Sequence, residues 1–205
     1  MKKQTAIYSG QKSKHLKREI PLEEIDKTWT LFLDRDGVIN YEKHLDYIHT
    51  WEEFKFYEGA TEAIKIFTEK FKRILVVTNQ RGVGKGLTKL DDLHTIHANM
   101  LEDIVKAGGH LDAIYYCSEL DINSPYRKPN PGMGLEAVKE FPEIDLTKTI
   151  MVGNTISDME FGRNLGVFTV FLPTTRPEVS LTDERIDLVC ESLIDFAQKL
   201  AAYKL

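Results

Sequence analysis

Asp34 and Asp36 are the two residues whose type and spacing point most directly to chemistry. They stand two positions apart, directly before Gly37, in the stretch LFLDRDGVIN. Two carboxylates this close repel each other unless a cation or a proton lies between them. Glycine lets the backbone turn where a side chain would block it. An isolated motif of this kind is usually an ordinary turn, so its meaning depends on the stretches that follow.

Thr78 begins a second stretch of interest, which continues through 79–86 with the sequence NQRGVGKG. A glycine-rich loop with a lysine invites a phosphate-binding interpretation. The nucleotide-binding P-loop requires Ser or Thr directly after its lysine to ligate magnesium, and Gly86 stands there instead. We therefore reject a P-loop, but expect the Thr78 hydroxyl and the loop amides to donate hydrogen bonds to an oxyanion.

Lys128 and Asp158 belong to the remaining two stretches. Pro129 and Pro131 make the segment RKPNPG stiff and extended, which holds Lys128 near the start of a predicted helix. Asp158 ends the segment GNTISD, which also contains Asn154. Either segment alone would be read as a solvated loop, so the question is whether the fold brings them to Asp34.

Alternating apolar runs and helical periods show which elements position these stretches. Strands are predicted at 29–33, 74–78, 113–117, 149–152, 167–172 and 187–190. Helices are predicted at 59–71, 88–107 with Thr88 as N-cap, 132–141, 157–165 and 192–203. Strands that alternate with helices form a parallel sheet between two helical layers, a three-layer α/β fold. The carboxyl ends of parallel strands share one edge, so a carboxylate pair, a hydroxyl, a lysine and a further acid converge there. This set suits phosphoryl transfer through a covalent aspartyl intermediate.

The four stretches, in this order, resemble the motifs of the haloacid dehalogenase (HAD) superfamily of phosphatases. The matching segments are DRDGV, VVTN, RKPNPG and GNTISDME. The longer segments DRDGVIN, DYIHTWEEFKFYEGA, TNQRGVGKG and YRKPNPGMG are similar to the branch of D-glycero-D-manno-heptose-1,7-bisphosphate phosphatases and histidinol-phosphate phosphatases. The resemblance runs from Trp29 to the C-terminus and implies a Rossmann-like fold. Only 44 residues separate Asp34 from Thr78, so we expect no large cap domain.

The resemblance implies a role for each motif residue. Asp34 would attack phosphorus, Asp36 would act as general acid and base, Thr78 would hold a phosphate oxygen, and Lys128 would neutralise the transferring group. The implied Mg²⁺ ligands are Asp34, Asp36, Asn154 and Asp158. Beyond the resemblance, we predict that the residues that bind substrate are Asn79, Gln80, Arg81, Lys85 and Arg127. Arg127 is our first choice for a second phosphate, because its planar guanidinium matches phosphate oxygens.

Two features depart from the resembling families. Their members commonly carry Asp where this chain has Asn154, and an amide is a weaker Mg²⁺ ligand than a carboxylate. Either Asp158 then carries the metal together with water, or the affinity is reduced. Many heptose bisphosphate phosphatases also have a zinc-binding loop of Cys and His. Here Cys117 has no second Cys and no His between it and Lys128, so no structural zinc is expected.

Two further segments carry weaker predictions. The aromatic-rich stretch 41–57 is longer than most connections and directly follows the aspartate pair, so we expect a lid or a substrate wall. His94 and His97 share a helical face, but no carboxylate-rich motif accompanies them. We interpret them as packing or surface histidines rather than metal ligands.

The bulk properties limit the function classes. The chain has 205 residues, a net charge of −5 and two cysteines. The negative charge argues against a nucleic-acid partner, and the two cysteines argue against a disulfide framework. No apolar run approaches the roughly 20 residues of a membrane helix, and the basic N-terminus lacks the apolar core of a signal peptide. We expect a cytoplasmic monomer with no membrane contact, made of a partly mobile N-terminal extension (1–27) and a HAD-like domain (28–205).

The leading hypothesis is therefore a Mg²⁺-dependent phosphatase that acts on a small phosphorylated sugar, most specifically a heptose bisphosphate. Three alternatives stay open at this point: histidinol-phosphate hydrolysis, removal of 3′-phosphates from polynucleotides, and phosphosugar binding without turnover. Asn154 motivates the last alternative. The presence of the nucleophile, acid, hydroxyl and lysine favours an enzyme.

Overall fold

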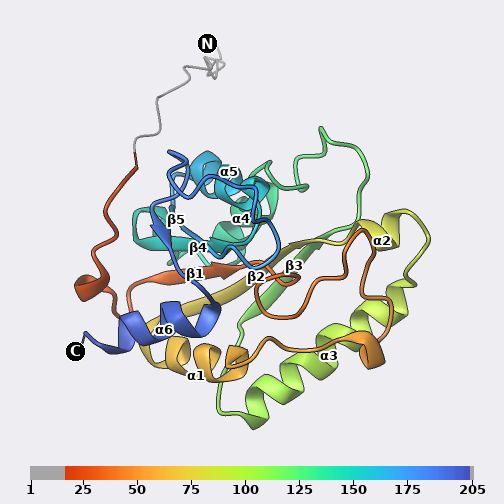
Figure 1. Ribbon diagram of the computed structural model, residues 1–205, viewed down its shortest axis with the longest axis horizontal. Helices are drawn as coiled ribbons and strands as arrows, with labels where there is room; N and C mark the ends of the chain where they lie inside the picture. The colour runs from red at the N-terminus through yellow and green to blue at the C-terminus, as the bar shows by residue number, and fades with distance from the viewer. Residues whose placement is uncertain (1–16, 204–205) are drawn as a thin grey trace, which may run out of the picture.

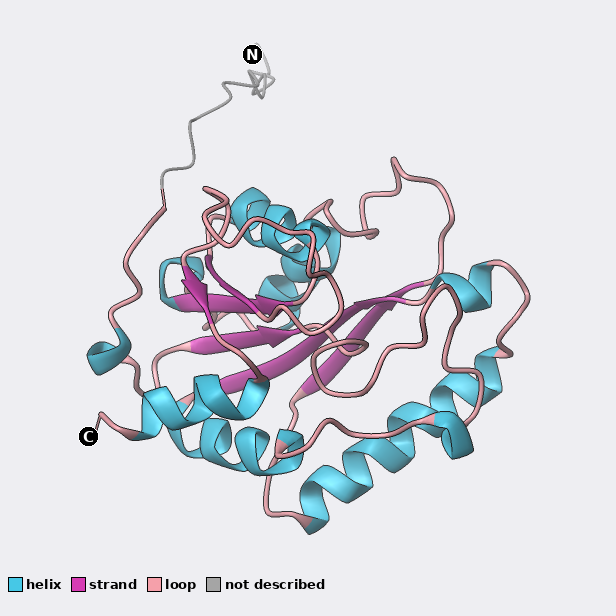
Figure 2. Ribbon diagram, viewed as in Figure 1, coloured by secondary structure: helices cyan, strands magenta, loops and turns pink. Residues whose placement is uncertain are grey.

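The centre of the molecule is a six-stranded parallel sheet. The structure, a computed structural model, describes residues 17–203. The strand order is β3-β2-β1-β4-β5-β6, and every adjacent pair is parallel. The strands are β1 (Thr30–Leu33), β2 (Arg73–Asn79), β3 (Ala113–Cys117), β4 (Thr149–Gly153), β5 (Phe168–Phe171) and β6 (Leu188–Val189). The predicted parallel α/β sheet is confirmed (Figures 1 and 2).

Helices cover both faces of the sheet, which makes three layers (Figure 1). One face carries α1 (Ala60–Lys70), α3 (Leu90–Lys106) and α6 (Leu193–Ala201), and the other carries α4 (Gly132–Glu140) and α5 (Ile156–Leu165). Side chains of a strand alternate between the two faces. In β1, Leu31 and Leu33 therefore pack in the core with α1 and α6, whereas Phe32 packs in the core with α4 and α5. Because β1 is buried on both sides, the three residues after Thr30 are all apolar.

The start of α3 differs from the prediction. Thr88 is not its N-cap: the helix begins at Leu90, and Lys89 occupies the cap position without a side-chain bond. The Thr88 hydroxyl lies 2.8 Å from Nδ1 of His49 on the aromatic loop instead. A long-range partner has thus replaced the local cap. The loop after β2 also contains a short helix that the glycine pattern did not predict, α2 (Arg81–Gly84).

The predicted substrate wall, which we call the aromatic loop (residues 41–57), is closed at its base by backbone bonds. Tyr41 N–H donates to the Lys55 carbonyl at 2.9 Å, and Tyr57 N–H donates to the Ile39 carbonyl at 3.0 Å. Inside the loop, the rings of Trp51 and Phe54 stack with centroids 4.9 Å apart. A 3₁₀ helix, Trp51–Glu53, is its one regular element among the described residues. The base of the loop is therefore fixed next to β1.

The described part of the N-terminal segment packs on the sheet domain. Ile20 and Ile25 are buried in the core that contains α6. The Arg18 side chain lies 3.4 Å from buried Asp187, which Arg163 also contacts at 2.6 Å. The predicted boundary at residue 27 remains a prediction, and residues 1–16 lie outside the described range. No helix within 17–203 has the length and apolar character needed to span a bilayer.

Candidate active site

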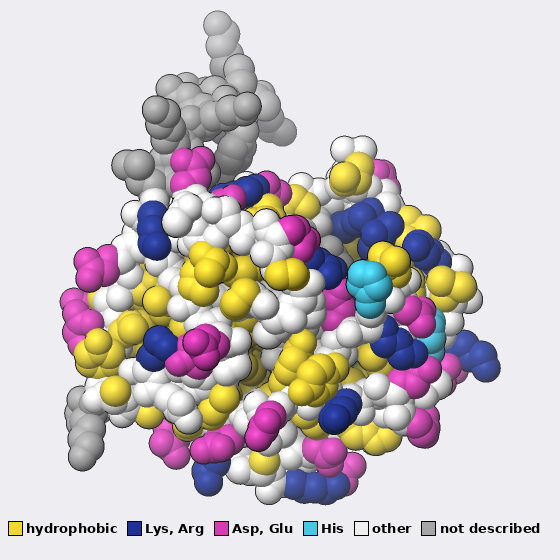
Figure 3. Space-filling model, viewed as in Figure 1, with side chains coloured by type: hydrophobic (Ala, Val, Ile, Leu, Met, Phe, Trp, Pro, Cys, Tyr) yellow, Lys and Arg dark blue, Asp and Glu magenta, His cyan; other side chains and the backbone are white. Residues whose placement is uncertain are grey.

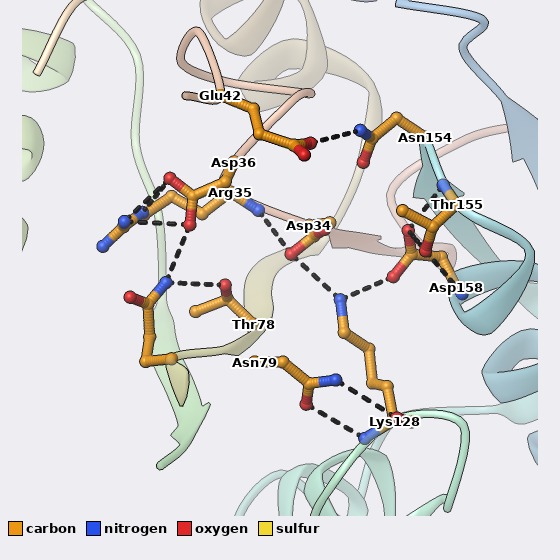
Figure 4. A network of polar contacts seen from close by, with 11 residues as sticks. Asp34, Arg35, Asp36, Glu42, Thr78, Asn79, Lys128, Asn154, Thr155 and Asp158 are labelled. Atoms are coloured by element: carbon orange, nitrogen blue, oxygen red, sulfur yellow. Dashed lines mark hydrogen bonds and ion pairs between the residues drawn. The ribbon is translucent and has the colours of Figure 1, made fainter. Parts of the chain in front are cut away.

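The four predicted stretches meet at the carboxyl edge of the sheet, around β1 (Figure 4). β1 lies between β2 and β4, where the strand order reverses, and ligands of open α/β sheets bind at this place. A cleft of about 330 Å³ opens there. Its floor includes Asp34, Asp36, Thr78, Lys128 and Asp158. The aromatic loop contributes the wall residues Glu42, Lys43, Asp46, Tyr47 and Ile48, as expected for a lid or wall.

The central interaction is a buried lysine between two buried carboxylates. Lys128 Nζ lies 2.9 Å from Asp34 Oδ1 and 2.6 Å from Asp158 Oδ1. Burial raises the pKa of Asp34 to about 7, against the opposing effect of Lys128 and with the charge of Asp158 adding to it. Burial alone would lower the pKa of Lys128, but the two carboxylates outweigh it and raise that pKa, so the ammonium keeps its proton. When both carboxylates are ionised, the cluster has two negative charges against one positive charge, and a bound cation would stabilise that state.

Local hydrogen bonds hold Asp158 and Lys128 in place. Thr155 caps α5, and its hydroxyl and backbone N–H donate to Asp158 Oδ2 at 2.7 and 3.0 Å. The other carboxylate oxygen is left for Lys128. A side chain at Gly153 would place its Cβ 2.2 Å from the Asp158 Cβ, so only glycine allows this approach. Asn79 bonds both the N–H and the carbonyl of Lys128, at 3.0 and 3.1 Å.

Asp36 is held by donors on three other side chains. Arg35 donates to its two oxygens at 2.8 and 2.9 Å, and Asn40 and Gln80 each donate at 2.9 Å. Burial favours the neutral acid, but the Arg35 charge and these bonds outweigh it and lower the pKa of Asp36. Arg35 Nη1 also lies 3.1 Å from Nε2 of His97. Burial and Arg35 lower the pKa of His97 to about 3, so a neutral imidazole accepts this bond.

The residues predicted to bind substrate fall into two groups. Asn79 and Gln80 use their side chains within the site: Asn79 fixes Lys128, and Gln80 donates to the Thr78 hydroxyl at 3.0 Å. Because that oxygen accepts from Gln80, its own hydrogen is available to a bound oxyanion. Arg81 and Arg127 line the cleft.

Lys85 has a different position from the other four predicted substrate-binding residues. It is not among the residues that line the cleft, and its ammonium lies 5.3 Å from the ring centroid of Tyr47. The structure therefore gives Lys85 a packing partner on the aromatic loop.

Asn154 lies directly behind the cleft: it is fully buried, is not among the cleft-lining residues, and has one side-chain oxygen without a partner in the described part of the chain. Its Nδ2 donates to Glu42 Oε2 at 3.1 Å and to Thr175 Oγ1 at 2.6 Å. Its Oδ1 is buried and has no hydrogen-bond partner among the described residues. A side chain at Gly37, whose φ is +83°, would place its Cβ 2.0 Å from Nδ2, so the turn after Asp36 must be glycine. Because Thr155 caps α5, Asn154 is not needed as the cap.

These donors fit a Mg²⁺ ion. Magnesium prefers oxygen ligands and is usually held by one or two carboxylates with additional neutral oxygens. Within residues 17–203, no three His, Cys, Asp or Glu side chains are placed to hold one metal ion. The ligand set must therefore include neutral atoms, and the unpartnered Asn154 oxygen is suited to this role.

Sequence reasoning missed several contacts of the site. The fork of Arg35 on Asp36 and the two-point bond of Asn79 to Lys128 depend on side-chain direction, which the motifs do not reveal. The capping box of Thr155 and Asp158 had a readable signal, Thr followed by an acid three residues later. The bond from Glu42 to Asn154 spans 112 residues and had no local signal.

Comparisons with known proteins identify the family of the chain. Residues 4–166 match the family model described as haloacid dehalogenase-like hydrolase. The D-glycero-alpha-D-manno-heptose-1,7-bisphosphate 7-phosphatase of Campylobacter jejuni is 37% identical over 71% of this chain and 83% of its own length. The D-glycero-beta-D-manno-heptose-1,7-bisphosphate 7-phosphatase of Haemophilus influenzae is 31% identical over 85% of this chain and 97% of its own length.

A solved structure extends the likeness to the fold. It is the D,D-heptose 1,7-bisphosphate phosphatase from B. bronchiseptica, complexed with magnesium and phosphate. It is 27% identical, with a TM-score of 0.77, and the match covers 86% of this chain and 99% of that one.

The chain belongs to the haloacid dehalogenase-like hydrolases. The predicted likeness to the heptose bisphosphate phosphatases within that family is confirmed by both the sequence and the structural comparisons. The enzyme class, a phosphatase that hydrolyses phosphomonoester bonds, is confirmed with it.

The Lys128 cluster leads to a prediction about stability. Lys128→Met should destabilise the fold by about 3–5 kcal/mol, because two buried carboxylates lose their counter-ion. The pKa of Asp34, already raised by burial, then loses the opposing effect of Lys128 and rises further, so the native state binds more protons than the unfolded state and stability falls as pH rises. The additional loss should develop between the ordinary Asp value of 3.8 and a pH at or above about 7.

Urea unfolding across that pH range would measure the effect. Lys139→Met, which removes an exposed lysine of α4, is the matched control and should change little. Lys128→Met/Asp158→Asn should recover part of the loss, because one buried charge is removed. A loss that does not change with pH would contradict the charge explanation.

Proposed function

We propose that this chain is a Mg²⁺-dependent phosphatase that removes the 7-phosphate of D-glycero-D-manno-heptose 1,7-bisphosphate through an aspartyl-phosphate intermediate. The observation that carries the proposal is the buried Asp34 on the floor of the cleft, paired with Lys128 at 2.9 Å. The named relatives and the magnesium and phosphate in the B. bronchiseptica enzyme support the choice of substrate and cofactor.

Mg²⁺ would be held by the side chains of Asp34, Asn154 and Asp158 and by the Asp36 carbonyl. When bound, it would offset the repulsion between the phosphate dianion and a carboxylate nucleophile. Lys128 would also reduce this repulsion, because its ammonium lies beside Asp34. The Thr78 hydroxyl, which accepts from Gln80, would donate to a phosphate oxygen.

The first half of the reaction transfers the phosphoryl group to the enzyme. A carboxylate oxygen of Asp34 forms a bond to phosphorus while the bond from phosphorus to the sugar oxygen breaks. Asp36 gives its proton to the leaving alkoxide. Asp36 rests as a carboxylate because Arg35 lowers its pKa, but a phosphate dianion in the cleft adds negative charge nearby and favours protonation.

The second half restores the enzyme. Water attacks phosphorus, Asp36 takes the proton from that water, and the bond from phosphorus to Asp34 breaks to release inorganic phosphate. The donors on Arg35, Asn40 and Gln80 fix the Asp36 carboxylate that must accept this proton. The same side chain thus serves as acid and then as base.

The cleft mouth can accept a second phosphate. Among the described residues, neither Arg81 nor Arg127 forms an ion pair, whereas Lys43 is paired with Glu53 at 2.7 Å and Arg176 with Glu42 at 2.6 Å. Arg127 also donates to the Leu120 carbonyl, which limits its movement. Figure 3 shows dark blue Lys and Arg side chains gathered at the upper right, in the part of the molecule where Figure 1 labels α2.

A substrate screen tests the proposal as a whole. Release of phosphate should be fastest from the heptose 1,7-bisphosphate, should leave the 1-phosphate in place, and should require Mg²⁺. Both anomers belong in the screen, because relatives of each type match this chain. Faster turnover of histidinol phosphate or a 3′-phosphorylated oligonucleotide would reassign the substrate.

The two aspartates should fail in different ways. Asp34→Asn should abolish turnover and leave no covalent phosphoenzyme, because the nucleophile is lost while the shape is kept. Asp36→Asn should lower kcat by about 10²–10⁴-fold on alkyl phosphates, since an amide cannot transfer the proton. On p-nitrophenyl phosphate, whose leaving group needs no proton, phosphoenzyme formation should be much less impaired.

Rapid-quench measurement of phosphoenzyme formation and breakdown would separate these cases. Unfolding curves close to wild type would show that both variants fold. Substantial turnover by pure Asp34→Asn would exclude the covalent mechanism.

Arg127→Ala should raise KM for the bisphosphate far more than for the heptose 7-phosphate, because only the former loses a contact. A lost charge-assisted bond of about 1.5–3 kcal/mol corresponds to roughly 10–150-fold. Arg127→Lys should recover part of the loss, and Lys139→Ala on α4 is the control. Equal effects on both substrates would place Arg127 at the reacting phosphate or in the fold.

A further inference from the structure

We propose that Glu42 is a positioning residue for the cation site. It fixes the rotation of the Asn154 side chain so that the amide oxygen, and not the amide nitrogen, faces the cation. This inference rests on the proposed function, since it needs a Mg²⁺ site at the carboxyl edge of the sheet. It assigns a role to a residue of the aromatic loop that none of the four motifs contains.

The hydrogen bonds around Asn154 form a closed triangle. One hydrogen of Nδ2 goes to Glu42 Oε2 at 3.1 Å and the other to Thr175 Oγ1 at 2.6 Å. The Thr175 hydroxyl donates its own hydrogen to Glu42 Oε2 at 3.1 Å. Every hydrogen in the triangle has one acceptor. A half-turn of the amide would put Oδ1 against the Glu42 carboxylate with no hydrogen between them, so Glu42 selects the observed rotation.

The selected rotation leaves Oδ1 as the free atom. Asn154 is fully buried, and this oxygen has no partner among residues 17–203. In Figure 4 it turns toward the side where Asp34 lies. A buried acceptor without a partner is costly, and a bound cation removes that cost. The Glu42–Asn154 pair thus presents Oδ1 as a ligand, and in the part of the chain that the structure describes this oxygen has no hydrogen-bond partner until a cation binds.

Glu42 itself acts through Asn154. Arg176 lies 2.6 Å from its Oε1 and both fixes and offsets the carboxylate. Glu42, Asp34 and Asp158 are not close enough to form a three-acid metal group in the described chain. Both oxygens of Glu42 already accept hydrogen bonds, Oε1 from Arg176 and Oε2 from Asn154 and Thr175, so this carboxylate is suited to orient a ligand.

A carboxylate at position 154 would not need this help. An amide has one oxygen and one nitrogen, whereas the two oxygens of a carboxylate are equivalent, so its rotation by a half-turn changes nothing. A carboxylate there would also face the Glu42 carboxylate without a hydrogen between them, and the two would repel. The effect of removing Glu42 must therefore reverse sign when Asn154 is replaced by Asp.

Four proteins test this reversal: wild type, Glu42→Ala, Asn154→Asp and the double variant. The readout is Mn²⁺ affinity, measured by electron paramagnetic resonance of free Mn²⁺, with Mg²⁺ as competitor. Glu42→Ala should weaken Mn²⁺ binding by about 10–100-fold, as loss of an orienting partner typically does. In the Asn154→Asp background the same change should tighten binding, and the double variant should bind at least as well as wild type.

Two further variants complete the design. Glu53→Ala removes a carboxylate of the same loop that pairs with Lys43 and does not line the cleft, so its Mn²⁺ affinity should stay near wild type. Thr175→Val removes the other acceptor of the Asn154 amide and should weaken binding in the same direction as Glu42→Ala. It provides the test if Glu42→Ala does not fold, which urea unfolding would show.

The outcomes separate this inference from the proposed function. Equal losses on removing Glu42 in both backgrounds, or no loss in either, would overturn the orienting role while metal-dependent hydrolysis stood. A wild-type protein that binds neither Mn²⁺ nor Mg²⁺ would overturn the proposed cofactor as well. A reversal of sign between the two backgrounds supports the orienting role, because simple loss of charge or of folding would not produce it.

Discussion

The active site depends on one ammonium group shared by two buried carboxylates. Lys128 lies within 3 Å of both Asp34 and Asp158, and none of the three is substantially exposed. Two anions with one cation leave uncompensated negative charge in a region of low dielectric constant, where it is expensive. Burial raises the pKa of Asp34, and the charge of Asp158 adds to that rise. A second cation would offset the negative charge of the two carboxylates and would reduce their repulsion of a bound phosphate.

The rest of the site keeps these charged groups in place. The parallel sheet brings β1, β2 and β4 to one edge, and short polar motifs then fix the side chains. The cap residue Thr155 binds one oxygen of Asp158 and leaves the other for Lys128. The Asn79 side chain fixes Lys128 by hydrogen bonds to its backbone. A buried arginine, supported by a neutral histidine, holds Asp36. Each of these contacts has two effects: it gives a buried polar atom a hydrogen-bond partner, and it fixes the position of Asp158, Lys128 or Asp36.

The fold and the convergence of Asp34, Thr78, Lys128 and Asp158 could be predicted from the sequence for a clear physical reason. Strands buried on both faces have apolar runs, as at 31–33 and 150–152, and polar residues directly after them must lie at the sheet edge. Contacts between distant loops leave no such pattern. The pattern predicts a helix cap at Thr88 because it shows only neighbours in sequence, whereas the Thr88 hydroxyl bonds to His49. His97 is buried, as expected of a packing histidine, and the pattern gave no sign of its contact with Arg35. Glu42 was invisible for the same reason, since its partners lie more than 100 residues away.

The closed base of the aromatic loop makes this loop a separable module of the fold. Backbone bonds join 39–41 to 55–57, so the chain enters and leaves the loop at almost the same place. The residues between can change in length or composition without transmitting strain to β1, because the base absorbs the difference. In evolution or in engineering, such a loop can be exchanged while Asp34, Thr78 and Lys128 stay where they are. Its exchange is limited at one position, because the loop also carries the carboxylate that contacts Asn154. Diversification of specificity in this scaffold is therefore expected to spare residue 42 and to concentrate toward the tip.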